Sequence, residues 1–302
     1  MIPFVREFDF VHGRRDQVSP LIQRVIAANP GPFTYTGTGT YIIGHDAPGA
    51  SLAVIDPGPA DEMHLHALMA AVNGRRVSHV LVTHTHSDHS PLARPFAQRT
   101  GATILAAQPP ARETHASGRL DEEEDGAFQP DVILTGGERI MGDGWTFEAM
   151  ATPGHASNHM AFVLDEENAL FSGDHVMGWS TTVVAPPDGD MVAYMASLDA
   201  VIARDFATLW PTHGAPIIEP APFLAAYRAH RLGREDQILA RLAAGDQTIP
   251  AMIPTLYAAV DRRLWPAASL SVLSHLIKLV KDGRATATPE PTMSALYALA
   301  SD

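Results

Sequence analysis

A dense group of potential metal ligands constrains this chain more than any other feature of its sequence. Residues 77–82 form a short, β-branched and apolar run, which predicts a buried strand. Four ligands follow it within six positions: His84, His86, Asp88 and His89. On extended chain, side chains two positions apart share a face, so His84 and His86 can bind one ion. The chain must turn before the adjacent Asp88 and His89. The pattern therefore favours one pair of ligands for each of two metal ions over a histidine-rich surface loop.

The ligand chemistry is limited to nitrogen and oxygen, because the chain contains no cysteine. Disulfides, thiolate zinc sites and a cysteine nucleophile are therefore excluded. Fifteen histidines are many for 302 residues, and several lie in predicted loops next to Gly, Pro or Asp. This distribution favours a metal centre.

Alternating short strands and helices predict an α/β fold for the first two thirds of the chain. The patterns indicate strands at residues 41–44, 52–56, 102–106, 132–134, 145–150, 159–164 and 169–171, and helices at residues 61–72, 91–100 and from about residue 190. Three glycine-bearing turns add one candidate ligand each, namely His155, Asp174 and His213. Strand ends that deliver single polar side chains into loops are typical of a site on a rigid scaffold.

Charge divides the chain near residue 220. Residues 1–220 carry 12 Lys and Arg against 27 Asp and Glu, whereas residues 221–302 carry 9 against 7. We therefore predict a large domain of residues 1–220 and a small domain of residues 221–302. The acidic balance of the large domain argues against broad, unspecific nucleic-acid binding.

The sequence predicts a soluble protein with no membrane partner. No apolar segment approaches the ~20 residues that cross a bilayer. The N-terminus has no basic start followed by a long apolar core, so we expect a cytoplasmic location by default. Association into a homo-oligomer is left open.

The small domain is predicted to be mostly helical. Helices are expected from residue 222 to about residue 244, at residues 255–262 and at residues 266–282. Lys278 and Lys281 match the negative end of the last helix dipole, with nucleic-acid contact as the alternative. An acidic run at residues 121–125 predicts a solvated loop, with an acidic lid as the alternative.

The H-x-H-x-D-H spacing of residues 84–89 resembles the signature of the metallo-β-lactamase superfamily, and the resemblance extends along residues 33–214. It implies a four-layer αββα metallo-β-lactamase sandwich. It also implies two ligand sets, with His84, His86 and His155 for one ion, Asp88, His89 and His213 for the other, and Asp174 as the bridge.

The same resemblance implies a hydrolase with a binuclear metal centre. Two divalent ions about 3.5 to 4 Å apart lower the pKa of a bridging water, so that hydroxide exists at neutral pH. Zn²⁺ is the first expectation, and Mn²⁺ or Fe²⁺ are alternatives. Asp88 is the expected catalytic residue, because its carboxylate can orient the nucleophile.

Five more residues are predicted to support the site. Thr83, His159 and His175 are candidates to contact the ligands from outside, since a metal-bound imidazole needs a partner for its other nitrogen. The apolar, proline-rich segment at residues 178–187 is predicted to line the substrate pocket through Trp179 and Thr181. Ordinary packing is the alternative for His159, His175 and Trp179.

The chain also resembles one branch of the superfamily that carries a C-terminal winged-helix domain and includes a mitochondrial endoribonuclease-like protein. Residues 37–41 and 230–238 carry this resemblance. It leaves several functions open. The first is hydrolysis of a small ester, thioester or related acyl substrate, as in glyoxalase II-type hydrolases. The others are an RNA phosphodiesterase, which the acidic charge disfavours, an iron-dependent sulfur dioxygenase, and a winged-helix regulator without catalysis.

Overall fold

Two β-sheets packed face to face form the centre of the large domain. The computed structural model describes residues 1–47, 49–110 and 124–300. The first sheet has its seven strands in chain order, and the second has the order β12-β11-β10-β9-β8. The first sheet comprises β1 (Arg15–Gln17), β2 (Ile22–Ile26), β3 (Gly39–Ile43), β4 (Leu52–Ile55), β5 (Val77–Leu81), β6 (Thr103–Ala107) and β7 (Val132–Leu134). The second comprises β8 (Arg139–Gly142), β9 (Trp145–Ala151), β10 (Met160–Leu164), β11 (Ala169–Gly173) and β12 (Thr208–Pro211).

Large apolar side chains fill the space between the sheets. Trp145, Phe147 and Ala149 of β9 are buried there at every second position, as the two-residue period of a strand requires. Tyr41 of β3 packs edge-on against Phe171 of β11, so the two sheets share one core.

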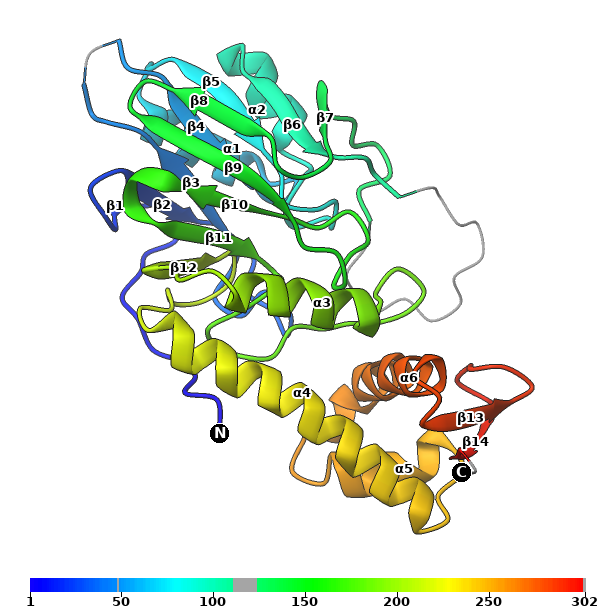
Figure 1. Cartoon of the computed structure of the whole chain (residues 1–302). Coiled ribbons are helices and arrows are strands. Elements are labelled where there is room, and N and C mark those ends of the chain that lie inside the picture. The colour runs from blue at the N-terminus through cyan, green and yellow to red at the C-terminus, as the bar shows by residue number, and fades with distance from the viewer. Residues whose placement is uncertain (48, 111–123, 301–302) are drawn as a thin grey trace.

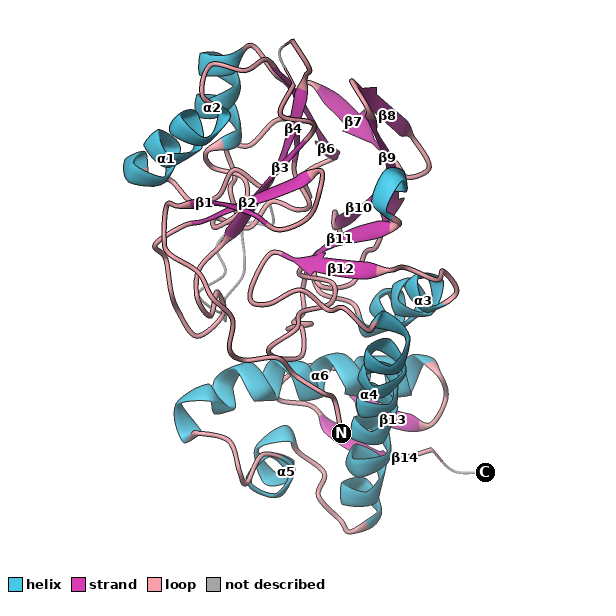
Figure 2. Ribbon diagram, turned by 90° about the vertical axis from the view of Figure 1, so that its left-hand side faces the viewer, coloured by secondary structure: helices cyan, strands magenta, loops and turns pink. Residues whose placement is uncertain are grey.

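Helices cover the outer face of each sheet. The helices α1 (Glu62–Val72) and α2 (Ala93–Thr100) pack on the first sheet, and α3 (Met191–Ile202) packs on the second. Figure 2 shows them on opposite sides of the strands. This order confirms the predicted αββα sandwich. No helix among the described residues has the length and apolar character needed to span a membrane.

The N-terminal segment contains two strands that the sequence patterns did not indicate. All five residues of β2 are buried, including Gln23 and Arg24, so the strand has no polar face. A strand with two buried polar residues at its centre shows neither alternation nor a continuous apolar run.

The C-terminal region is a helical module with a small hairpin. It contains α4 (Pro220–Ala243), α5 (Ile249–Leu256), α6 (Trp265–Lys281) and the antiparallel pair β13 (Ala285–Thr288) and β14 (Leu296–Leu299). These elements share a core of their own. Figure 1 shows α4 running from the large domain into this module. Because α4 contributes Phe223 and Tyr227 to the core beneath the second sheet and Ile238 to the C-terminal core, the boundary at residue 220 stays a prediction.

The predicted helix at residues 255–262 was wrong. The structure places α5 at Ile249–Leu256 and a short 3₁₀ turn, η2, at Arg262–Leu264. Pro250 lies in the first turn of α5, where the missing N–H has no acceptor in any case. Pro254 is accommodated near the end of the helix. In the sequence, both prolines indicate an interruption rather than a helix.

The two lysines of α6 form ion pairs within the chain. Lys278 Nζ lies 3.2 Å from Glu235 Oε1, and Lys281 Nζ lies 2.9 Å from Asp190 Oδ2 at the start of α3. Both lysines are in the last turn of α6, as the dipole interpretation predicts. The predicted alternative of nucleic-acid contact would have to compete with these pairs.

Candidate metal centre

The candidate ligands meet at one edge of the two sheets. The loop after β5 carries the 84–89 cluster, and the loops after β9, β11 and β12 carry His155, Asp174 and His213. Their ligand atoms form three groups, and within each group the atoms lie within 4.8 Å of one another. All seven predicted ligands belong to these groups, which comprise His84, His86 and His155, then His84, His89 and Asp174, then Asp88, His89 and His213.

Three imidazoles make up the first set. His86 Nδ1 lies 2.9 Å from His84 Nε2 and 3.1 Å from His155 Nε2. Burial, followed by neighbouring imidazoles, holds the pKa of His84 well below its usual value and lowers the pKa of His86 to about 3. Neutral imidazoles whose nitrogens converge in a buried space are suited to a divalent cation.

The second set adds a carboxylate to two imidazoles. Asp88 Oδ2 lies 3.3 Å from His89 Nε2 and 3.1 Å from His213 Nε2. Burial would raise the pKa of Asp88, but His89 and His213 hold it well below its usual range. The carboxylate is therefore ionised and able to bind a metal.

Asp174 lies between the two sets. Its Oδ2 is 3.4 Å from His213 Nε2, 3.7 Å from His89 Nε2 and 4.0 Å from His155 Nε2. Among the described residues, the buried atoms Asp174 Oδ1 and His89 Nε2 have no hydrogen-bond partner. Buried polar atoms without a partner are costly, so both atoms fit ligands of a cation.

Further contacts fix the orientation of single ligands. Thr83 Oγ1 lies 3.0 Å from His84 Nδ1, which is the contact predicted for it. His159 Nε2 accepts from the backbone N–H of Asp174 at 3.1 Å, and its Nδ1 is 2.8 Å from Thr152 Oγ1. His175 differs, because neither of its ring nitrogens has a hydrogen-bond partner in the described parts of the chain. Its ring lies 4.9 Å from that of Tyr194, an arrangement of ordinary packing.

A buried carboxylate that sequence reasoning missed lies behind the cluster. Asp56 follows β4 and accepts hydrogen bonds from Thr83 N at 2.8 Å and from His89 Nδ1 at 2.9 Å. It also accepts from the hydroxyls of Thr83 and Thr212. Its φ of +48° is unusual for a residue other than glycine. In the sequence, this residue only ends the predicted strand at residues 52–56, and that pattern gives it no role in the site.

One of the two predicted pocket residues, Trp179, lies beside the loop that carries His213. Trp179 stacks on Tyr35, with ring centroids 4.6 Å apart and planes 7° apart. A Cβ at Gly214, next to His213, would approach Trp179 to 3.0 Å. Thr181 is half-buried, and the hydroxyl of the neighbouring Thr182 donates to the backbone carbonyl of Asp174. A pocket role for Trp179 and Thr181 stays a prediction.

The described end of the acidic run contacts the ligand loop. Residues 121–123 lie outside the described residues. Glu124 Oε2 accepts from Thr85 Oγ1 at 2.8 Å, and Asp125 Oδ2 accepts from Ser90 Oγ at 2.9 Å. The interpretation of this run as a solvated loop was therefore wrong for Glu124 and Asp125. Polar groups on the facing loop bind these two carboxylates.

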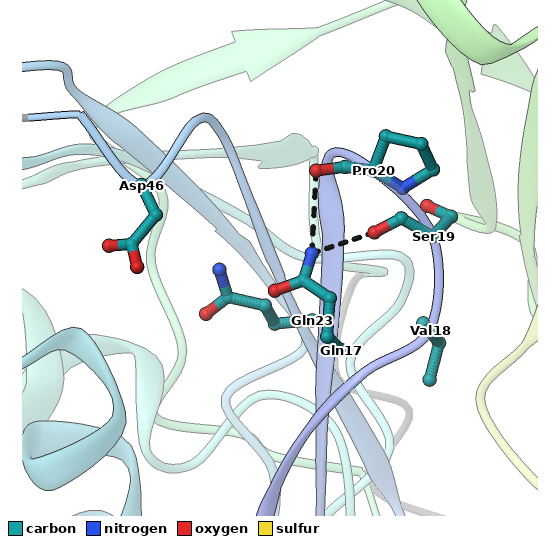
Figure 3. A pocket seen from close by; sticks show the side chains of 6 residues that line it. All are labelled: Gln17, Val18, Ser19, Pro20, Gln23 and Asp46. Carbon is teal, nitrogen blue, oxygen red and sulfur yellow. Dashed lines mark hydrogen bonds between the residues drawn. The ribbon is translucent and has the colours of Figure 1, made fainter.

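A separate cavity of ≈ 330 Å³ lies away from the cluster (Figure 3). Its lining includes Gln17 and Asp46, and Gln17 Nε2 donates to the carbonyl of Ser19 at 2.7 Å. Asp46 follows the end of β3, whereas the ligand cluster lies near the beginning of that strand. No candidate ligand lines this cavity, so it is not part of the centre.

Metal binding to the second set is expected to release protons. Burial opposes protonation of His213, but Asp174 and Asp88 prevail and raise its pKa to about 10. Burial likewise opposes protonation of His89, and Asp88, Asp174 and Asp56 raise its pKa well above the usual value. Below these pKa values, and with no metal bound, each imidazole carries a second proton. A metal ion must displace that proton to bind the nitrogen. His84 and His86 are already neutral.

We therefore predict that the two ions bind with different pH dependence. From about pH 6.5 upwards, affinity at the second set should rise with pH by about tenfold per unit for the proton that leaves His213, whose pKa is about 10, and more steeply where His89 also loses a proton. Affinity at the first set should change much less. Zinc titration with a competing chelator and a pH indicator measures both. Equal slopes at both sets would contradict the assigned protonation.

Comparison with known proteins agrees with this geometry. The profile described as "Metallo-beta-lactamase superfamily" matches residues 38–213, and the profile "Beta-lactamase associated winged helix domain" matches residues 248–290. Both the predicted superfamily and the predicted winged-helix domain are thereby confirmed.

The similar proteins include a thioesterase. An "Atrochrysone carboxyl ACP thioesterase" of Aspergillus chevalieri is 33% identical over 234 residues, which cover 76% of this chain and 68% of the relative. "Lactamase-like protein adaB" of Aspergillus niger is 29% identical over 325 residues, which cover 99% and 96%. A metallo-beta-lactamase family protein from Thermus thermophilus has the same fold, with a TM-score of 0.75 and 22% identity over 94% of this chain and 100% of that one. The chain therefore belongs to the metallo-beta-lactamase superfamily.

Proposed function

We propose that this hydrolase of the metallo-beta-lactamase superfamily binds two divalent metal ions and cleaves an acyl thioester. The observation that carries the proposal is the convergence of seven buried or half-buried ligands into two facing sets with Asp174 between them. Six of the seven ligand side chains are at most 9% exposed, so the centre is largely shielded from water.

The two sets would hold the two ions separately. His84, His86 and His155 would bind the first ion through nitrogen, and Asp88, His89 and His213 would bind the second. Asp174 would contact both. When bound, such ions polarise a carbonyl oxygen and lower the pKa of water. Nitrogen and carboxylate ligands suit Zn²⁺, and they also admit Mn²⁺ or Fe²⁺.

Asp88 would orient the attacking water. With a side-chain exposure of 19% against 0% for His89 and 1% for His213, it is the most accessible ligand of its set. Thr38 Oγ1 lies 3.2 Å from Asp88 Oδ2 and holds that oxygen. The other carboxylate oxygen can accept a hydrogen bond from water as it attacks the thioester carbonyl. The C–S bond then breaks, and the thiol leaves with a proton.

The substrate class is supported by relatives and by charge. The relative from Aspergillus chevalieri, which is 33% identical to this chain, is named a thioesterase. The excess of acidic residues in the large domain disfavours a polyanionic RNA. No observation on the described residues favours the phosphodiesterase or the sulfur dioxygenase, and both stay alternatives for experiment.

A substrate panel tests the proposed function. Zinc-loaded protein is assayed against a thioester, an oxygen ester, a phosphodiester, a β-lactam and single-stranded RNA, and chelated protein is the control. We expect the highest kcat/KM on the thioester and loss of turnover on chelation. Cleavage of the phosphodiester or RNA without thioester hydrolysis would overturn the substrate class. Fewer than one metal ion per chain in the loaded protein would overturn the metal centre itself.

A further inference from the structure

Two side chains of the C-terminal helix α4 bind both peptide groups of one residue near the metal centre. The N–H of Thr182 donates to Tyr227 Oη at 2.6 Å, and its carbonyl accepts from Arg231 Nη2 at 2.5 Å. Tyr227 and Arg231 are four positions apart, so they lie on the same face of the helix. All three residues are buried. The backbone of Thr182 is thus fixed by α4.

The residues that α4 fixes in turn contact two candidate metal ligands. Thr182 Oγ1 lies 2.7 Å from the backbone carbonyl of Asp174, whose side chain lies between the two ligand sets. The carbonyl of the next residue, Val183, accepts from His155 Nδ1 at 2.6 Å. A displacement of residues 182–183 would therefore reach one ligand of the first set and the bridging ligand together.

The contact to Val183 decides which nitrogen of His155 is available. A neutral imidazole has one N–H, and the carbonyl of Val183 requires that this proton be on Nδ1. The lone pair of Nε2 then faces His86 and Asp174. Partners of this kind orient metal ligands and set their basicity.

Burial of the Arg231 side chain carries a desolvation penalty. Arg231 is buried, and among the described residues its Nε has no hydrogen-bond partner. The aromatic rings of Tyr194 and Tyr227 face it at 4.9 Å and 5.9 Å, which compensates part of the desolvation. An apolar side chain would avoid the penalty of a buried charge. The hydrogen bond to Thr182 is what such a replacement would lose.

We propose that Arg231 and Tyr227 are positioning residues of the metal centre, through which the C-terminal helix sets the geometry of His155 and Asp174. This inference rests on the proposed metal centre. It gives helix α4 a part in the metal centre that requires no nucleic acid.

Cobalt titration of the full-length protein tests the inference without depending on activity. Arg231→Met keeps most of the side-chain volume and removes the donor, and Tyr227→Phe removes only the hydroxyl. Both variants should bind Co²⁺ about tenfold more weakly than the unsubstituted protein and show a changed visible absorption spectrum. Thioester kcat should fall while KM stays nearly constant. Arg231→Lys keeps a donor for the carbonyl of Thr182 and should recover part of the affinity.

Arg228→Met is the matched control, because Arg228 lies on the same helix and binds Asp199 of α3 at 2.6 Å but not Thr182. It should leave the cobalt affinity and spectrum unchanged. If the unsubstituted protein binds cobalt and Arg231→Met and Tyr227→Phe bind it equally well, the inference is overturned and the proposed function stands. If the unsubstituted protein binds no metal, both fail. Should Arg231→Met not fold, Tyr227→Phe decides alone.

Discussion

Replacing Asp88 by asparagine is expected to lower kcat on a thioester by about 10²–10⁴-fold, the usual contribution of a positioned group that accepts a proton. Asparagine has nearly the same shape and can still accept a hydrogen bond from Thr38, which is 3.2 Å away. It removes the charge that faces His89 and His213. The free energy of unfolding should change much less than the rate. Kinetics on zinc-loaded protein, with metal content measured for every sample, provide the comparison.

The metal content separates two causes of the loss. A variant that retains two ions and still turns over slowly has lost the orientation of the nucleophile, whereas one that retains a single ion has lost a ligand. Asp199→Asn is the control, since Asp199 is an exposed carboxylate on α3 that pairs with Arg228. Full activity in Asp88→Asn would show that the carboxylate has no part in catalysis.

The sequence could single out the seven candidate ligands because their signal is local. Four of them lie within residues 84–89, and the other three follow strand ends in turns marked by glycine. Spacing along an extended chain limits which side chains share a face, so a short motif specifies much of a metal site. The alternation of apolar runs and turns predicted an α/β fold, and the four-layer sandwich was what the resemblance to the metallo-β-lactamase superfamily implied.

Contacts between distant parts of the chain could not be predicted in the same way. Asp56 lies 27 residues before Thr83 and 156 before Thr212, and the three residues are brought together only by the folded structure. Arg231 belongs to the apolar stripe of a helix, and nothing in that pattern indicates that its guanidinium reaches the carbonyl of Thr182. The role of such residues depends on contacts in the folded structure. The residues next to them in the sequence do not predict it.

Asp56→Asn is expected to weaken metal binding at the second set by about 10–100-fold while leaving the first set nearly unchanged. Asp56 Oδ1 accepts from the backbone N–H of Thr83, and Oδ2 accepts from His89 Nδ1 and from two threonine hydroxyls. An asparagine must place its NH₂ group at one of these positions. If the NH₂ group faced the backbone N–H of Thr83, two donors would face each other, because a backbone N–H cannot become an acceptor.

In the other orientation the NH₂ group faces His89 Nδ1 and the hydroxyls. The hydroxyls can rotate and become acceptors, but His89 can adapt only by moving its proton to Nε2. That nitrogen faces Asp88 and Asp174 and is the one proposed to bind the metal. The φ of +48° at residue 56 is tolerated by asparagine, so backbone strain should not confuse the result.

Zinc titration with a competing chelator resolves the two affinities. Asp61→Asn is the matched control, because Asp61 caps α1 by accepting from Met63 N, and asparagine caps helices equally well. It should bind both ions as the unsubstituted protein does. Equal weakening at both sets in Asp56→Asn would indicate a general disturbance of the fold. Unchanged affinity at the second set would contradict the prediction. It would show that the proton of His89 stays on Nδ1 without the carboxylate of Asp56.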